Sequence, residues 1–319
     1  IDTKADLNAT NRSGDNALIT AAKNGHAACL SVLLDARANT DTRNEKGETA
    51  LIQAADQNHT ACLKALIDAK ANVDATTDFG DTALIVAVSK GHVLSQQVLL
   101  EAKADMDIRN KDGNTALLTA VRQDHSACLQ MLLEAKADAN LGLPKGMPPA
   151  MLAAGIGGPL CLQMLLDAGG VNDNAEDVLF MSTWQGQTAC MQLLLDAKVD
   201  VNAESSGVTS LLVAAGKGDT ACLQMLLDAK AGVNVPNQFG DTASTVAAYK
   251  GHTACLQLLL AAKAHIDTVN QFGDSALMVA ARAGHTVCLQ LLIDKNADIG
   301  IKTQHGDNAM ILATWKGHT

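Results

Sequence analysis

The chain has 319 residues, of which 48% are apolar, 18% are charged and only 2% are aromatic. This composition is typical of a folded protein, with a core built mainly from Ala and Leu. The net charge of −10 argues against a nucleic-acid surface, which needs a concentrated basic stripe. No apolar run approaches the length of a membrane-spanning helix and no secretory leader opens the sequence, so we expect an intracellular, cytoplasmic protein.

An internal repeat organises the whole sequence. Eight cysteines recur, most of them 33 residues apart, and Ser95 stands at the midpoint of the single 66-residue gap. These cysteines are Cys29, Cys62, Cys128, Cys161, Cys190, Cys222, Cys255 and Cys288. A fixed period of this length indicates one supersecondary unit that is copied and stacked, rather than a globule folded around a single core.

The units follow one another from end to end of residues 1–319, which we interpret as a single solenoid. The tail of a repeat comes first, at residues 4–8. Nine units then start near residues 11, 44, 77, 110, 143, 175, 205, 237 and 270, and a partial one starts at 303. Neither end has a polar capping repeat, so we expect the chain to be part of a longer one, or to have its ends covered by a partner.

Residues 237–269 illustrate the unit. A turn containing Gly240 comes first, and Thr242 is then expected to cap the amino terminus of a short helix over residues 243–249. A Gly-His pair ends this helix, and a second, Leu-rich helix is predicted over residues 253–262. Neither helix is long enough to be stable alone in water, so stability must come from stacking.

This pattern resembles the ankyrin repeat. Residues 80–92 read Gly-Asp-Thr-Ala-Leu-Ile-Val-Ala-Val-Ser-Lys-Gly-His, which is similar to the family's Gly-x-Thr-Pro-Leu-His-x-Ala-Ala-x-x-Gly-His. The resemblance covers the whole chain and implies an all-α solenoid of helix-turn-helix units, curved, with short turn or hairpin fingers. It also implies that the recurring His makes structural hydrogen bonds within the turn between its two helices.

Several departures from the family pattern are informative. The Gly that usually follows the second helix is kept only as Gly169, and each replacement costs on the order of 1 kcal/mol if it is left-handed. The replacements are Arg37, Lys70, Lys103, Lys136, Lys198, Lys230, Lys263 and Asn296. Residues 143–204 depart further, with four prolines in the fifth unit and about four residues lost from the sixth, and we expect a weak or bent segment there.

The sequence shows no catalytic, cofactor or metal site. Cysteines at the same place in stacked repeats lie about 8–10 Å apart, whereas a disulfide needs Cα atoms within about 7 Å. They are expected to be small buried hydrophobes, as free thiols in a reducing compartment. The histidines are likewise spread one per repeat and cannot converge on one metal ion. No phosphate-binding, nucleophile or metalloprotease motif is present, so we expect no enzyme activity and no cofactor.

A row of lysines could dock an acidic partner. Lys70, Lys103, Lys136, Lys198, Lys230 and Lys263 should line one edge of the stack. Most have an acidic residue two positions before them, so the favoured interpretation is a solvated edge.

The aromatic residues mark the expected partner surface. Six of the seven occupy two repeat positions that vary freely in ankyrin repeats, just before the turn Gly or at the end of the first helix. With neighbouring cations, the candidate protein-binding residues are Phe79, Trp184, Phe239, Tyr249, Phe272, Arg282, His305 and Trp315, and Lys250 and Lys316 lie beside them. Exposed aromatic and Arg residues are typical of interface hot spots. The alternatives are that Phe packs on the adjacent finger and that Trp184 fills a gap, while Phe180 is expected in the core.

We therefore predict a non-catalytic scaffold or linker that binds a protein partner on its concave or finger surface, with no nucleic acid and no membrane insertion. The alternatives are a regulatory ankyrin segment of a larger enzyme or channel, and a stably bound structural subunit of a large assembly.

Overall fold

A computed structural model describes residues 6–144, 146–171 and 174–315. Within these residues each of the first nine repeats contributes two short helices, and the tenth contributes one. The first helices are α1 (Ala17–Lys23), α3 (Ala50–Asp56), α5 (Ala83–Ser89), α7 (Ala116–Arg122), α9 (Pro149–Ile156), α11 (Ala175–Gln185), α13 (Ser210–Lys217), α15 (Ala243–Lys250), α17 (Ala276–Ala283) and α19 (Ala309–Trp315). The second helices are α2 (Ala27–Asp35), α4 (Thr60–Asp68), α6 (Val93–Glu101), α8 (Ser126–Glu134), α10 (Pro159–Asp167), α12 (Thr188–Asp196), α14 (Thr220–Asp228), α16 (Thr253–Ala261) and α18 (Thr286–Asp294). One finger forms a hairpin of β1 (Glu204–Ser205) and β2 (Val208–Thr209), paired antiparallel.

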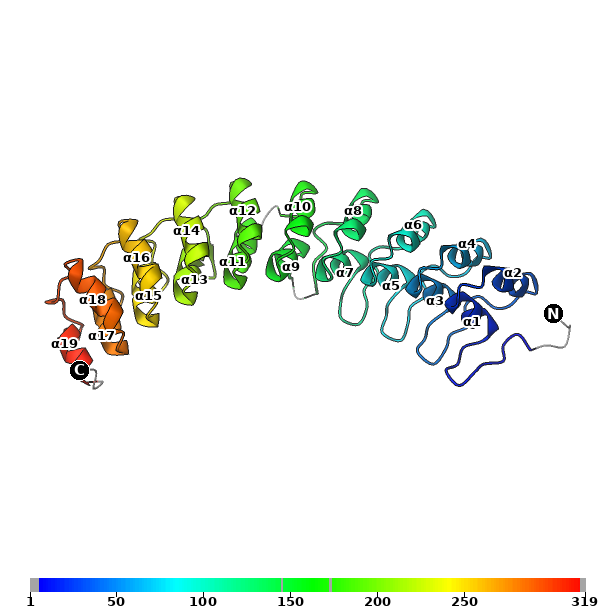
Figure 1. Cartoon of the computed structure of the whole chain (residues 1–319), viewed down its shortest axis with the longest axis horizontal. Helices are drawn as coiled ribbons and strands as arrows, with labels where there is room; N and C mark the ends of the chain where they lie inside the picture. Colours follow the sequence, from blue (N-terminus) through cyan, green and yellow to red (C-terminus); the bar gives the residue numbers. More distant parts are fainter. Residues whose placement is uncertain (1–5, 145, 172–173, 316–319) are drawn as a thin grey trace. The chain divides into compact units, whose positions relative to one another are not determined.

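The repeats form two compact units. The first unit consists of Ile1–Ala153 and Leu160–Gly170, and the second of Ala154–Pro159 and Val171–Thr319. In the first unit, α1, α3, α5 and α7 lie side by side, α2, α4, α6 and α8 form a second row, and the finger loops extend beyond the first row (Figure 1). In the second unit, the first helices from α11 to α19 and the second helices from α12 to α18 likewise contact their neighbours in order.

A side-chain cap starts most of the first helices. The Thr242 hydroxyl accepts a hydrogen bond from the backbone N–H of Thr245, as expected of an N-cap residue. The two helices that follow, α15 and α16, match the ranges predicted for them to within one residue. The all-α solenoid fold predicted from the repeat pattern is therefore confirmed.

Each second helix is followed, two positions after its last residue, by a residue in the left-handed conformation. Lys70, for example, has a φ of 66°, and the N–H of Ala71 after it donates to the carbonyl of Leu66. This reversal satisfies carbonyls at the end of the helix that would otherwise lack a donor. All eight replacements of Gly at this position have positive φ angles, so the cost that the sequence made conditional on a left-handed conformation applies to each of them.

The two helices of each repeat contribute different residues to the core. First helices contribute small side chains such as Ala54 and Ala55, which are fully buried and let neighbouring helices approach closely. Second helices contribute leucines such as Leu63 and Leu66, also fully buried. Seven cysteines lie in this core as predicted, but Cys29 is exposed. The recurring cysteine faces the preceding repeat, because the Cys288 thiol contacts the Thr253 hydroxyl of that repeat. Cys29 is exposed because no described repeat precedes α2.

The recurring histidines join neighbouring repeats. A ring nitrogen of His125 donates to the carbonyl of Val88, in the preceding repeat, at 2.8 Å. The corresponding bonds run from His92 to Ala55 at 3.1 Å, from His252 to Gly216 at 3.2 Å and from His285 to Tyr249 at 3.0 Å. The expectation that each imidazole bonds within its own turn was therefore wrong for these four. The ring reaches the neighbouring first helix, because the end of that helix has carbonyl oxygens without intrahelical donors.

Candidate protein-binding surface

The fingers present Phe239 and Phe272 to solvent. In the second of these fingers, the side-chain oxygen of Asn270 accepts hydrogen bonds from the N–H groups of Phe272 and Asp274, both at 3.0 Å. The Asn270 amide nitrogen also donates to Asp241 in the preceding finger at 2.8 Å. The backbone and Asn side chains thus hold the fingers together, and the Phe239 and Phe272 rings stay 48% and 59% exposed.

Adjacent fingers are also joined through their backbones. The N–H of Gln271 donates to the carbonyl of Phe239 at 3.0 Å. Gly240 stands at this junction with a φ of 81°, and a Cβ there would come within 3.0 Å of the Gln271 nitrogen. Only Gly combines this conformation with so close an approach, so the turn that carries Phe239 depends on it.

Tyr249, Phe272 and Arg282 line one hollow between neighbouring repeats. Tyr249 is the last residue but one of the first helix α15 and is 54% exposed, and Arg282 occupies the same position in α17. Val246 and Val279, one turn earlier on the same helices, also line the hollow, and finger residues complete it. Three candidates predicted from the sequence thus meet at one place in the second unit.

Arg282 is held in place by a buried carboxylate. Its guanidinium forms an ion pair with Asp274, whose side chain is only 5% exposed, whereas the Arg282 side chain is 35% exposed. Arg has five N–H donors, so this contact leaves others free to meet a ligand. A second hollow, lined by Tyr249, Lys250, Arg282, Ala283 and His285, adjoins the first because Tyr249 and Arg282 line both.

The remaining candidates lie elsewhere. Trp184 is 48% exposed, stacks on Phe180 with ring centres 6.3 Å apart, and has the Lys217 ammonium 5.1 Å from its ring centre. Phe180 is half-buried, so the prediction that it belongs to the core was wrong, because its ring lies against Trp184. His305 and Trp315 are exposed but do not line these two hollows, and Lys316 lies outside the described residues.

The first unit carries Phe79, with its ring 68% exposed. Phe79 borders a hollow at the equivalent position, together with Val86 and carboxylates that include Asp56 and Asp81. This hollow lacks an aromatic residue at the end of the first helix, because Asp56 stands where Tyr249 stands in the eighth repeat. Phe79 therefore belongs to a separate surface of different charge.

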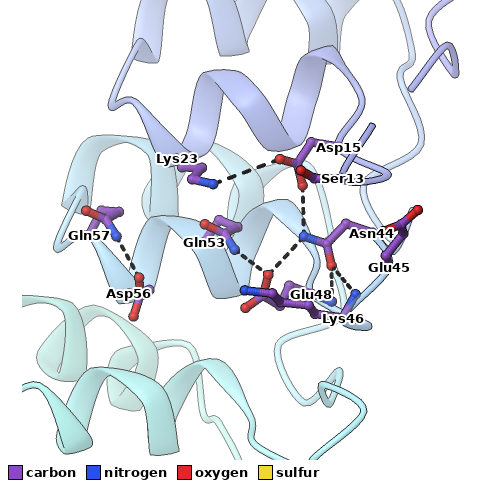
Figure 2. A pocket seen from close by; sticks show the side chains of 10 residues that line it. All are labelled: Ser13, Asp15, Lys23, Asn44, Glu45, Lys46, Glu48, Gln53, Asp56 and Gln57. Carbon is purple, nitrogen blue, oxygen red and sulfur yellow. Dashed lines mark hydrogen bonds and ion pairs between the residues drawn. The ribbon is translucent and has the colours of Figure 1, made fainter. Parts of the chain in front are cut away.

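The same place in the first two repeats is polar and internally bonded (Figure 2). Asn44 donates to Asp15 at 2.8 Å and to Glu48 at 2.9 Å, and Gln53 donates to Glu48 at 2.7 Å. Lys23 adds an ion pair with Asp15 at 4.0 Å. Because these groups already satisfy one another, the aromatic hollow of the eighth and ninth repeats is the stronger candidate for binding.

The lysine row lies exposed at the ends of the second helices. All six lysines are exposed, and none of them forms an ion pair within the described part of the chain. This arrangement agrees with a solvated edge.

Two of the buried cysteines have thiols of low reactivity. Burial raises the pKa of the Cys161 thiol to about 12, and a hydrogen bond that the thiol donates to the Asp124 carboxylate adds to the shift. Burial raises the pKa of Cys222 to about 12 in the same way, so these thiols are not nucleophiles at neutral pH. No cluster of three His, Cys, Asp or Glu side chains in the described ranges could hold a metal ion. None of the helices described is long and apolar enough to cross a membrane.

Sequence reasoning missed several residues of the hollow. Val246 and Val279 line it although nothing marks them apart from other apolar residues of first helices. The sequence did contain a signal for the contact between Asp274 and Arg282, because an acidic or amide residue stands eight positions before a cation. The same spacing joins Asn114 to Arg122 at 3.2 Å, and Asp15 to Lys23.

Stacked helical pairs joined by turn fingers, with exposed rings on the fingers and first helices, define an α-helical repeat protein suited to binding. A family model described as Ankyrin repeats (3 copies) matches residues 1–77, 69–142, 150–238, 198–270 and 245–319. The chain therefore belongs to the ankyrin-repeat family. Ankyrin repeats are in general non-catalytic modules of protein–protein interaction. No curated protein matches the chain.

Proposed function

We propose that this chain is a non-catalytic scaffold or linker that binds a protein partner on the surface formed by its fingers and first helices. The observation that carries the proposal is the hollow lined by Tyr249, Phe272 and Arg282, which come from two neighbouring repeats. Aromatic and Arg side chains are the residues that most often dominate binding energy at protein interfaces.

The exposure of the aromatic rings supports this function. Six rings of a chain that is only 2% aromatic are between 48% and 76% exposed. Burying one such ring against a partner would contribute about 1.5–3 kcal/mol. The burial of seven of the eight cysteines also supports a reducing, intracellular environment.

Affinity capture with two matched variants tests the proposal. One bait carries Tyr249→Ala and Phe272→Ala, which remove exposed rings from the hollow. The control carries Leu94→Ala and Val287→Ala, which remove side chains that are 61% and 66% exposed on second helices. We expect wild type and control to capture the same partner in stoichiometric amount and the aromatic variant to lose it. Equal capture by all three would place the interface elsewhere.

An exposed apolar face favours a second candidate, a stably bound subunit of a large assembly. Ala21, Cys29, Val32 and Leu33 of α1 and α2 line an open hollow, and Val32 is 52% exposed. Apolar surface of this kind is normally covered. For a subunit, size-exclusion chromatography of a native extract would show no free monomer.

A further inference from the structure

The two hollows that share Tyr249 and Arg282 differ in chemistry. Val246, Val279 and the ring of Phe272 contribute to the first, which can take an apolar side chain. Lys250 and His285 contribute to the second, which lies toward the ends of α15 and α17. A ligand that occupies both hollows must therefore place an apolar group beside a polar or charged one.

The carboxylates near the hollows lie in the fingers and already have partners. Asp274 pairs with Arg282, and Asp241 accepts a hydrogen bond from the Asn270 amide at 2.8 Å. Both carboxylates lie in the fingers, ahead of the first helices, so they border the apolar hollow rather than the second one.

The carboxyl ends of the first helices, on the side away from the fingers, carry cations in successive repeats. Lys217 and Lys250 occupy equivalent positions at the ends of α13 and α15, and each lies over an aromatic ring. The Lys250 ammonium is 5.5 Å from the centre of the Tyr249 ring, and no carboxylate of the described residues lies within ion-pair distance of either lysine. A helix end has a partial charge of about −0.5, which a full positive charge on each lysine outweighs.

From this arrangement, and resting on the proposed function, we infer that the two adjoining hollows together recognise an extended acidic peptide. One apolar side chain of the peptide lies over Val246 and Val279, between Tyr249 and Phe272. A neighbouring carboxylate of the peptide lies at Lys250 and Arg282, and a further one reaches Lys217. Charge complementarity selects an acidic peptide over a basic one, although the chain as a whole carries a net charge of −10.

Tyr249 provides a direct probe, because it is the only tyrosine of the chain. The full chain labelled with 3-fluorotyrosine gives a single fluorine NMR signal from the site itself. Three series of nonapeptides would be titrated, each with a central Phe or Leu flanked on both sides by Glu, by Gln or by Lys. We expect a saturable shift with the Glu series, an affinity about ten-fold lower with the Gln series, and no saturation with the Lys series.

Matched charge variants test the role of the lysines. Lys217→Gln together with Lys250→Gln should weaken binding of the Glu peptides by about five- to ten-fold and reduce its salt dependence. Lys295→Gln with Lys302→Gln changes the net charge equally at exposed positions outside the hollows and should leave binding unchanged. Equal weakening by both pairs would mean that only net charge matters and would overturn the inference.

The inference and the proposed function fail in different ways. If the Gln peptides bind as tightly as the Glu peptides and Phe272→Ala abolishes both, the acidic preference is overturned while partner recognition stands. If no series shifts the Tyr249 signal, the inference is overturned, and the capture experiment decides the function independently.

Discussion

The residue two positions after each second helix adopts a left-handed conformation although it is rarely Gly. Lys70, with a φ of 66°, is one of eight such residues, and its side chain is exposed. A Cβ in this conformation comes too close to the following carbonyl oxygen, at a cost of about 1 kcal/mol per residue. The chain tolerates this cost in nearly every repeat because hydrogen bonds on either side hold the turn.

Replacing this residue by Gly should therefore stabilise the fold. We expect Lys70→Gly to raise the free energy of unfolding by up to about 1 kcal/mol, since the strain disappears and no packed side chain is lost. Lys64→Gly is the matched control, because Lys64 is exposed in the middle of α4 in the same repeat and should cost about 1 kcal/mol. Urea unfolding followed by circular dichroism measures both, and a lower midpoint for Lys70→Gly would refute the expectation.

At the scale of elements, α6 departs most from the other second helices. Ser95 replaces the recurring cysteine, and its hydroxyl donates to Asn58 of the preceding repeat at 2.7 Å. Gln96 replaces a buried leucine, and its amide nitrogen donates to the Cys128 carbonyl at 2.9 Å. The side-chain oxygen of Gln96 is buried and has no hydrogen-bond partner among the described residues.

Restoring the apolar residue should stabilise the packing of α6 against α8. We expect Gln96→Leu to raise the free energy of unfolding by about 1–2 kcal/mol, because it removes a buried oxygen without a donor. Gln97→Leu, at an exposed position of the same helix, is the control and should change stability by less than about 0.5 kcal/mol. Thermal unfolding of the two variants beside wild type gives the comparison. A loss of stability in Gln96→Leu would show that the Gln96 amide stabilises the stack.

For the whole molecule, the division into two units falls within the fifth repeat, between Ala153 and Ala154 of α9. Helices α9 and α10 both begin with proline. The next first helix, α11, begins at Ala175, and its N-cap residue Asn174 makes no side-chain capping bond. The Asn174 side-chain oxygen has no partner among the described residues. Most other first helices have such a bond, which is typically worth about 1 kcal/mol.

Hydrogen exchange should locate the weakest part of the array. We expect backbone amides of α9 and α11 to exchange about ten-fold faster than those of α5 and α13, which have Thr caps, because less free energy is needed to open them locally. Exchange monitored by mass spectrometry on the full chain makes this comparison within one molecule. Uniform protection along the array would contradict the expected weakness of residues 143–204.

Much of this protein follows from the sequence alone. The period, the helical pairs, the Thr caps and the family were predictable, because each depends on chemistry within one repeat and the same pattern recurs along the whole chain. The candidate residues Tyr249, Phe272 and Arg282 were predictable as well, because a ring or cation at a variable surface position stands out in a chain with few aromatics.

The tertiary structure decided what happens between repeats. The sequence places His125 in a turn, but only the stack shows that its ring donates to Val88 of the neighbouring helix. The structure also showed that Cys29 is exposed and that Val246 and Val279 line the hollow beside Tyr249. The physical reason is common to all of these features. Local capping and turn chemistry act over a few residues, whereas each of these contacts depends on how one repeat packs against the next.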